Sequence, residues 1–257
     1  MDYISLARTH KIENLTMELN YNNQTATSEK VLHVHVSVNE PSKFELLEQS
    51  VAEKKIHFFL KRSFDIAVSS ILIILFSPIL ITVAIIIKLT SKGPVLYSNE
   101  RVGLGNENFK CHKFRSMVSD HSKKHDDHKR AVEHAEKGIL HKDKNDSRVT
   151  WIGKLIRKTS IDELPQLFNV LSGDMSIVGP RPLVPFMLKP FPEFKEIRGL
   201  VRPGITGLWQ IRDREHNTSA EFMIEHDTEY IQDYSFFLDM KILFETPLVV
   251  ISGKGAY

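Results

Sequence analysis

The sequence predicts an α+β fold of mostly short helices, in which a compact globular domain is attached to one long membrane-associated helix. The main indication is an almost unbroken apolar run from Ile66 to Ile87. From Trp151 onward, amphipathic stretches are separated by Gly and Pro, which predicts short helices. The residues at 95–97 predict a short strand.

The composition limits the classes of function. With 257 residues and 42% hydrophobic residues, the chain can form one sizeable domain or two small ones. A net charge of +2 is too small to indicate a nucleic-acid partner. The single cysteine, Cys111, cannot form an internal disulfide and is expected to be a small buried hydrophobe. The first thirty residues lack a continuous apolar core, so no cleavable signal peptide is predicted.

Three parts are predicted along the chain. Residues 1–55 form an N-terminal extension of unknown role, with an alternating run at 31–38 that is typical of a strand. Residues 56–92 form the membrane-associated part, and residues 93–257 form the globular domain. Within that domain the densely charged segment 120–148 is expected to be a solvated helix and loop. Three histidines there share a helical face, but interleaved lysines and aspartates favour a solvated face over a metal site; they are His121, His125 and His128.

The apolar run is long enough to cross a bilayer. Its residues, about twenty-two in number, make a helix of roughly 33 Å. Ser77 and Pro78 lie in the middle of the run. Because proline lacks the amide donor and clashes with the preceding turn, the helix is expected to kink or break there.

Basic residues flank both ends of this run. They are Lys54, Lys55, Lys61 and Arg62 before it, and Lys88 and Lys92 after it. Lysine and arginine favour the cytoplasmic side, and a helix that enters the bilayer and returns places both flanks there. The sequence therefore favours a re-entrant helix with its break at Ser77 and Pro78. A kinked spanning helix stays open, since prolines are tolerated in transmembrane helices.

The final stretch, from about 219 to 251, has helical spacing of its apolar residues. Residues 236–244 are apolar enough to form an interfacial helix on the membrane surface. Packing in the protein core explains the same pattern equally well, so both alternatives stay open.

Segment 157–171, RKTSIDELPQLFNVL, carries the candidate chemistry. Ser160 and Glu163 fit a capping box, in which the serine caps a helix and the glutamate reaches back. Pro165 favours a later start, because proline is preferred at the first helical position. In both cases Asp162 lies at a helix N-terminus, which favours phosphate binding. The adjacent carboxylates fit a diphosphate with Mg²⁺, which prefers carboxylate and phosphate oxygens.

Six blocks in order identify a family. They are KRSFDIAVSS, GPVLYSNERVG, KFRSM, DSRVTWIGKLIRKTSIDELPQLFNVLSGDMSIVGPRP, VRPGITGLWQIRDR, and a closing segment with Asp227, Tyr230 and LDMKILFET. In these blocks the chain resembles the monotopic phosphoglycosyl transferases, the bacterial sugar transferase family that starts the assembly of cell-surface glycans on polyprenyl phosphate. The resemblance extends from about residue 61 to the C-terminus.

The resemblance implies a re-entrant helix and a globular part on the cytoplasmic face of the bacterial inner membrane. It implies that Asp162 attacks the β-phosphate of a UDP-sugar, releases UMP and holds the sugar phosphate covalently. Polyprenyl (undecaprenyl) phosphate then accepts the sugar phosphate, which initiates exopolysaccharide, capsule, O-antigen or glycoprotein glycan synthesis. The implied partners are the UDP-sugar, polyprenyl phosphate, membrane lipids and downstream glycosyltransferases. Nothing in the sequence indicates which sugar is carried.

The resemblance also implies the residues of the site. Asp162 and Glu163 are the catalytic dyad and the Mg²⁺ ligands, with Glu163 handling metal or proton unless it only caps the helix. Candidate substrate-binding residues are Lys113, Arg115, Arg157, Gln166, Asn169, Arg181 and Arg214. Arginine is expected here because its guanidinium matches phosphate geometry. Other roles stay open, namely anchoring to anionic lipid for Lys113 and Arg115, and helix packing for Gln166 and Asn169. Asp213 precedes Arg214 where the family usually has glycine.

Two other functions remain alternatives. A Mg²⁺-dependent phosphoesterase acting on lipid diphosphates would use the same carboxylates but would transfer to water. A non-catalytic, membrane-anchored module would recruit partners through segment 120–148, and Asp162 would then be dispensable.

Overall fold

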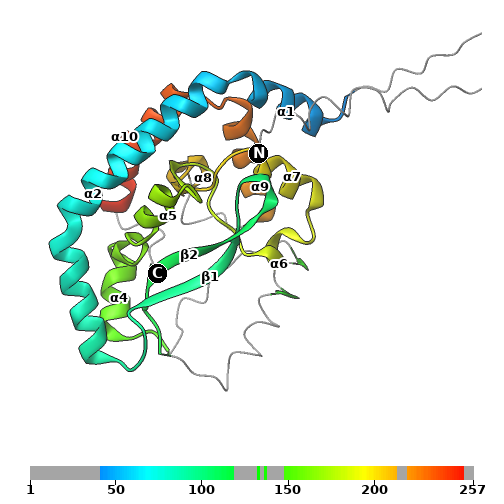
Figure 1. Ribbon diagram of the computed structural model, residues 1–257. Helices are drawn as coiled ribbons and strands as arrows, with labels where there is room; N and C mark the ends of the chain where they lie inside the picture. Colours follow the sequence, from blue (N-terminus) through cyan, green and yellow to red (C-terminus); the bar gives the residue numbers. More distant parts are fainter. Residues whose placement is uncertain (1–40, 119–131, 134–135, 138–147, 213–218, 252–257) are drawn as a thin grey trace, which may run out of the picture. The chain divides into compact units, whose positions relative to one another are not determined.

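Residues 41–118, 132–133, 136–137, 148–212 and 219–251 are described in the computed structural model of the chain (Figure 1). The chain divides into two units, residues 1–45 and residues 46–257, and the second unit contains the site. The predicted strand at 31–38, the three histidines of segment 120–148 and Arg214 lie outside the described residues.

Short helices and two small sheets make up the described elements, which confirms the α+β class. The helices are α1 (Lys43–Glu53), α2 (Lys55–Thr90), α4 (Trp151–Lys158), α5 (Gln166–Ser172), α6 (Pro185–Leu188), α7 (Pro192–Gly199), α8 (Leu208–Arg212), α9 (Ala220–Gln232) and α10 (Phe236–Ile251), with 3-10 turns η2 (Leu104–Asn106) and η3 (Ile161–Glu163). The strands are β1 (Leu96–Val102), β2 (Asn108–Phe114), β3 (Ser176–Val178) and β4 (Gly204–Thr206). β1 and β2 form an antiparallel hairpin, and β3 pairs with β4 in parallel.

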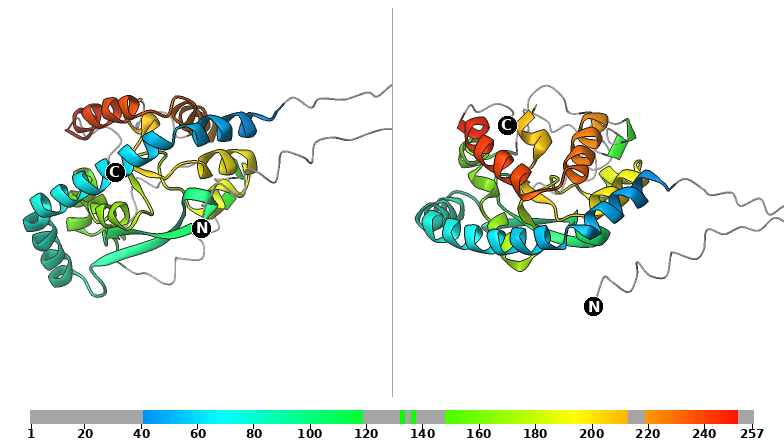
Figure 2. Two further views of the ribbon diagram at one scale, coloured as in Figure 1. Left: turned by 45° about the horizontal axis from the view of Figure 1, so that its top comes forward. Right: turned by 90° about the horizontal axis from the view of Figure 1, so that it is seen from above.

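Helix α2 is longer than the apolar run that predicted it. It has 36 residues, roughly 54 Å of helix, and begins at Lys55, well before Ile66. Figures 1 and 2 show it curving around one side of the second unit, with α10 beside its first half. In this first half Lys61, Asp65 and Ser69 are buried, whereas Ile56 and Phe59 are exposed. This first half is therefore docked on the protein.

The docking corrects the interpretation of Lys61 and Arg62 as charges that flank a membrane segment. Lys61 Nζ lies 2.6 Å from the carboxylate of Asp239 in α10 and donates to the carbonyl oxygen of Val178 at 2.8 Å. The Arg62 guanidinium donates to the last carbonyls of α5, at 2.6 and 2.8 Å. Both cations thus hold α2 against the domain, and only the remaining basic residues bear on membrane orientation.

Asp65 adds a second docking contact between α2 and β3. Its Oδ1 accepts from the backbone amide of Ile177 at 2.9 Å and from the hydroxyl of Ser176 at 3.0 Å. A buried carboxylate with two donors is compensated for part of its desolvation. The three charged residues Lys61, Arg62 and Asp65 of the block KRSFDIAVSS are therefore explained by contacts with strand β3 and helix α5.

The far end of α2 packs against the same unit. Val83 and Ile87 form a core cluster with Phe114 of β2 and with Ile152 and Ile156 of α4. α4 can approach the chain after β2 because Gly153 has no side chain, since a Cβ there would come within 2.0 Å of the carbonyl oxygen of Ser116. Both ends of α2 are thus fixed to residues of the second unit.

Of the expected kink or break at Ser77 and Pro78, the structure shows no break: helix α2 continues through both residues and follows a curved course. Pro78 has no amide to donate to the carbonyl of Ile74, one turn earlier. The hydroxyl of Ser77 donates to that same carbonyl oxygen at 2.8 Å. The serine therefore replaces the missing donor, which allows the helix to pass through the proline.

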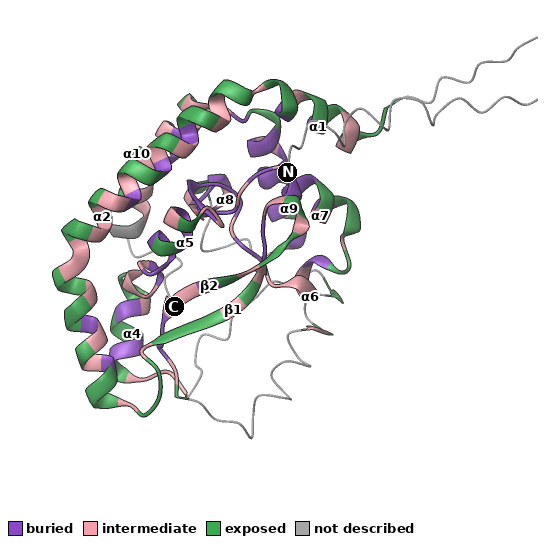
Figure 3. Cartoon of the chain, in the orientation of Figure 1, coloured by how far each residue is buried: buried purple, intermediate pink, exposed green. Residues whose placement is uncertain are grey.

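Large apolar side chains remain exposed on α2 and α10. Figure 3 colours much of α2 as exposed. α2 is long and apolar enough to cross a membrane by length and composition. On α10 buried and exposed apolar side chains lie on different faces. Ile242 is fully buried, whereas Phe237 and Phe244 are 84% and 75% exposed. α10 therefore contributes to the core with one face and presents apolar side chains to its surroundings with the other.

Candidate active site

The acidic pair lies in a turn between two helices. Thr150 caps the start of α4, because its hydroxyl accepts from the amide of Gly153 at 2.9 Å. α4 ends at Lys158, and Ser160 adopts a left-handed conformation with φ of 56°. This sharp turn leads into η3, which contains Asp162 and Glu163. The predicted capping box is wrong, because the side chain of Ser160 makes no capping hydrogen bond. The other alternative is confirmed, since α5 begins directly after Pro165.

Glu163 is held by two cations instead of reaching back to the helix. Its Oε1 lies 2.6 Å from Lys113 Nζ of β2 and 2.7 Å from Arg181 Nη2, which follows β3. All three side chains are largely buried. The carboxylate of Glu163 keeps the pKa of Arg181 above its ordinary value, so the guanidinium is charged. Three elements that are far apart in sequence therefore meet at Glu163.

Asp162 is half-buried beside this cluster. Its charge also raises the pKa of Arg181, which places the carboxylate within the electrostatic reach of that guanidinium.

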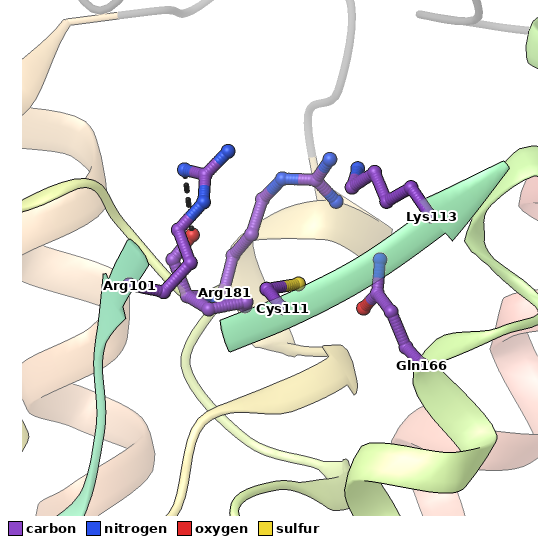
Figure 4. Close-up of a pocket in the computed structure, with 6 residues that line it drawn as sticks. Arg101, Cys111, Lys113, Gln166 and Arg181 are labelled. Atoms are coloured by element: carbon purple, nitrogen blue, oxygen red, sulfur yellow. Dashed lines mark hydrogen bonds between the residues drawn. The ribbon is translucent and has the colours of Figure 1, made fainter. Parts of the chain in front are cut away.

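Arg101 and Cys111 complete the wall of the site and were not predicted as site residues. Together with Lys113, Gln166, Arg181 and Pro182 they line a narrow pocket of about 10 Å³ (Figure 4). Arg101 donates to the carbonyl of Pro182 at 3.1 Å, and burial lowers its pKa. Burial raises the pKa of the fully buried Cys111 thiol, which stays protonated, as expected for a small hydrophobe. The only signal for Arg101 was its place in the block GPVLYSNERVG, because the hairpin register, which pairs Arg101 with Phe109, brings it to the wall beside Cys111.

Gln166 and Asn169, which were predicted together, are separated by the structure. Gln166 is buried and points into the pocket beside Lys113. Asn169 instead fixes α5 to β2: its Oδ1 accepts from the amide of His112 at 2.9 Å, and its Nδ2 donates to the carbonyl of Lys110 at 2.8 Å. Helix packing, the other open role, is what Asn169 does in this structure.

Arg115 and Arg157 bind protein groups at the membrane-helix side of the unit. Arg115 is buried and donates to the carbonyl of Ser91 at 2.8 Å, so it caps the C-terminal end of α2. Arg157 Nε donates to the hydroxyl of Ser116 at 2.8 Å. The structure places neither beside Glu163 in the way that it places Lys113 and Arg181.

The donor set for a metal is limited to this acidic pair. Among the residues that the structure describes, no three His, Cys, Asp or Glu side chains gather as a protein-made metal centre requires. Asp162 and Glu163 are hard oxygen donors, and Mg²⁺ characteristically binds one or two carboxylates together with substrate phosphates. The chemistry of the pair therefore fits a Mg²⁺ that the substrate helps to hold.

The model of one protein family, bacterial sugar transferase, matches residues 56–253. The chain belongs to the bacterial sugar transferase family. The match begins at the start of α2 and includes the acidic pair, both cations of Glu163 and the C-terminal helices.

Named relatives of this bacterial sugar transferase cover different shares of their own length. The exopolysaccharide production protein ExoY of Rhizobium meliloti (strain 1021) is 38% identical over 218 residues, which is 84% of this chain and 96% of the relative. A UDP-N-acetylgalactosamine-undecaprenyl-phosphate N-acetylgalactosaminephosphotransferase of Aeromonas hydrophila is 42% identical over 80% of this chain and 47% of its own length. An undecaprenyl-phosphate galactose phosphotransferase of Salmonella typhimurium is 41% identical over 81% of this chain and 44% of its own length. The chain thus spans nearly all of ExoY and less than half of the other two.

Proposed function

We propose that the protein transfers a sugar 1-phosphate from a UDP-sugar to polyprenyl (undecaprenyl) phosphate, through a covalent intermediate on Asp162. The observation that carries the proposal is the arrangement at η3, where a half-buried aspartate adjoins a glutamate that two cations hold. Relatives with phosphotransferase names, in which the acceptor is undecaprenyl phosphate, support the substrate class. The relatives differ in their sugar, so the proposal leaves the sugar open.

The charges of the site suit a diphosphate. Arg101, Lys113 and Arg181 line the pocket, and Lys113 and Arg181 bind the carboxylate of Glu163. Cations that are fixed by the fold can bind phosphate oxygens without first being reorganised. Glu163 keeps Lys113 and Arg181 together in the absence of substrate, and the phosphates compete with it for them. This requires the narrow pocket to widen when the substrate binds.

The reaction proceeds in two balanced displacements. A carboxylate oxygen of Asp162 attacks the β-phosphorus, the bond to the bridging oxygen breaks, and UMP leaves with the electron pair. An oxygen of polyprenyl phosphate then attacks the same phosphorus and displaces the Asp162 carboxylate, which is regenerated. The fixed cations stabilise the charge on the phosphoryl oxygens during both steps. A bound Mg²⁺, held by Asp162, Glu163 and the diphosphate, would offset the charge that repels the carboxylate from the phosphates.

We place the site on the cytoplasmic face of the bacterial inner membrane, with α2 as a re-entrant helix. Both ends of α2 pack against one globular unit, which favours having both ends on one side of the bilayer. In this fully described helix no residue of 70–82 is buried, and that stretch is about 20 Å long. A hydrocarbon core of about 30 Å is thicker than this stretch, so it can enter the membrane without crossing it. Downstream glycosyltransferases would then receive the product on the same face.

Topology is tested by cysteine labelling in a Cys111→Ala background. Lys55→Cys and Lys92→Cys place reporters at exposed positions near the two ends of α2, and Ile74→Cys is the control in its middle. We expect a membrane-impermeant maleimide to label both end positions in inside-out vesicles and neither in intact cells, with Ile74→Cys protected in both. Labelling of the two ends from opposite sides would show a spanning helix.

The reaction is tested with the detergent-purified full chain and a panel of UDP-glucose, UDP-galactose and UDP-N-acetylhexosamines. Without acceptor, we expect a burst of at most one UMP per protein molecule and a sugar phosphate adduct in the mass spectrum. With polyprenyl phosphate, UMP release should become continuous. Continuous release of free sugar phosphate without acceptor would instead show a phosphoesterase, and no turnover with any sugar would favour the non-catalytic module.

A further inference from the structure

A buried ion pair that lies outside the pocket binds the backbone of Arg181. Arg198 of α7 donates through Nη2 to the carbonyl oxygen of Arg181 and through Nη1 to the carboxylate of Asp227 in α9. The side chains of Arg198 and Asp227 are only 5% and 1% exposed. The pair cannot touch a substrate in the pocket, but it touches the residue that does.

We infer that Arg198 and Asp227 are positioning residues for Arg181, which they hold at the angle needed to bind the substrate phosphate. The inference rests on the proposed function, because it assigns to Arg181 a contact with the diphosphate. A site of this kind depends on its supporting contacts, since small displacements of a binding group cost affinity and rate.

The geometry requires both nitrogens of the Arg198 fork. One nitrogen is bound by Asp227 and the other reaches the carbonyl of Arg181, so the carboxylate sets the direction of the guanidinium. Among the described residues, Oδ1 of Asp227 has no hydrogen-bond partner, and Oδ2 accepts from Arg198. Burial raises the pKa of Asp227 to about 6, which leaves the carboxylate ionised at neutral pH. A lysine in place of Arg198 could satisfy only one of the two contacts well.

The same short segment is also held at its other end by α9. The carbonyl oxygen of Val178, three residues before Arg181, accepts from the hydroxyl of Tyr230 at 3.3 Å and from Lys61 Nζ at 2.8 Å. Tyr230 is three residues after Asp227, so both lie on one face of α9. The carbonyls at both ends of the segment 178–181 are therefore fixed, one of them through the membrane helix α2.

Stability alone is a weak explanation for the pair. Two buried charges lose their hydration, and replacing such a pair by apolar residues of similar volume is often neutral or stabilising. A role in orienting Arg181 explains why the pair is buried and why Arg198 bonds to the backbone of Arg181. The experiment must therefore separate an effect on stability from an effect on the orientation of Arg181.

The test is the double variant Arg198→Met with Asp227→Leu, which leaves no unpaired charge. Its matched control is Arg212→Met with Glu229→Leu, which removes an Arg–carboxylate pair between α8 and α9. That pair lies at 2.7 Å, and its side chains are 45% and 35% exposed. Thermal unfolding and kcat/KM for the UDP-sugar are measured for both. We expect both to stay folded, with kcat/KM reduced about tenfold only in the Arg198 and Asp227 variant.

A double-mutant cycle separates positioning from a general structural effect. If the pair acts through Arg181, the double substitution should cause almost no further loss in an Arg181→Gln background. An undiminished kcat/KM in the double variant, or a loss that is fully additive with Arg181→Gln, would overturn the inference. The cycle is repeated on the Kd of UDP. A wild-type protein that binds UDP but releases no UMP from any UDP-sugar would refute the proposed function, while the coupling in Kd would still decide the positioning role.

Discussion

Replacing Asp162 by asparagine is expected to abolish both the UMP burst and the sugar phosphate adduct. An amide oxygen carries no charge and does not attack phosphorus usefully, whereas the change in volume is small. The loss of a covalent nucleophile is expected to reduce kcat on the order of 10³-fold or more. The folded structure should persist, because Asp162 is only half-buried.

Two further variants serve as the comparison and the control for this experiment. Glu163→Gln removes the charge that holds Lys113 and Arg181 together, so the adduct should still form but on the order of 10–100-fold more slowly. Asp174→Asn changes a carboxylate that bonds to Ser172 at 2.6 Å outside the pocket, and it should leave the burst intact. A normal burst from Asp162→Asn would refute the aspartate as nucleophile, and a loss equal to that of Asp162→Asn in the Asp174 control would point to unfolding.

The sequence identifies several residues that the structure brings together at Glu163, but it does not identify the wall beside them. Asp162, Glu163, Lys113 and Arg181 were all expected near one another, because each lies in a block shared with the family. Arg101 was missed, since its place in the wall depends on the register by which β1 pairs with β2. Only the strand at 95–97 could be recognised in the sequence, and a register depends on contacts rather than on local composition.

Two basic residues before the apolar run were assigned a role that the structure does not bear out. Lysines and arginines beside such a run are usually interfacial, so local sequence favours that role for Lys61 and Arg62. The carboxylate that pairs with Lys61 belongs to Asp239, which is 178 residues away in sequence. The carbonyl acceptors of Arg62 are set by where α5 ends. Neither partner can be inferred from the neighbourhood of the cation, because both arise when α2 packs against the domain.

The Lys61 contact is expected to be among the strongest determinants of stability. Lys61→Met leaves Asp239 buried and without its cation, although the hydroxyl of Tyr230 still donates to it at 2.7 Å. Removing one partner of a buried pair costs about 3–5 kcal/mol. For a unit of this size, that corresponds to a decrease in Tm of roughly 10 °C. Thermal unfolding of the detergent-purified protein measures the change.

Two further variants decide whether charge is the cause. Lys54→Met removes a lysine that makes an exposed bond to the carbonyl of Gln232 at 3.3 Å, and it should change Tm by only a degree or two. Lys61→Met combined with Asp239→Asn leaves neither charge unpaired and retains an acceptor for Tyr230. It should therefore recover most of the lost stability. If the combined variant is as unstable as Lys61→Met alone, the buried charge is not the reason for the loss. The contribution of Lys61 would then come from its bond to Val178, the contact through which α2 holds the segment that leads to Arg181.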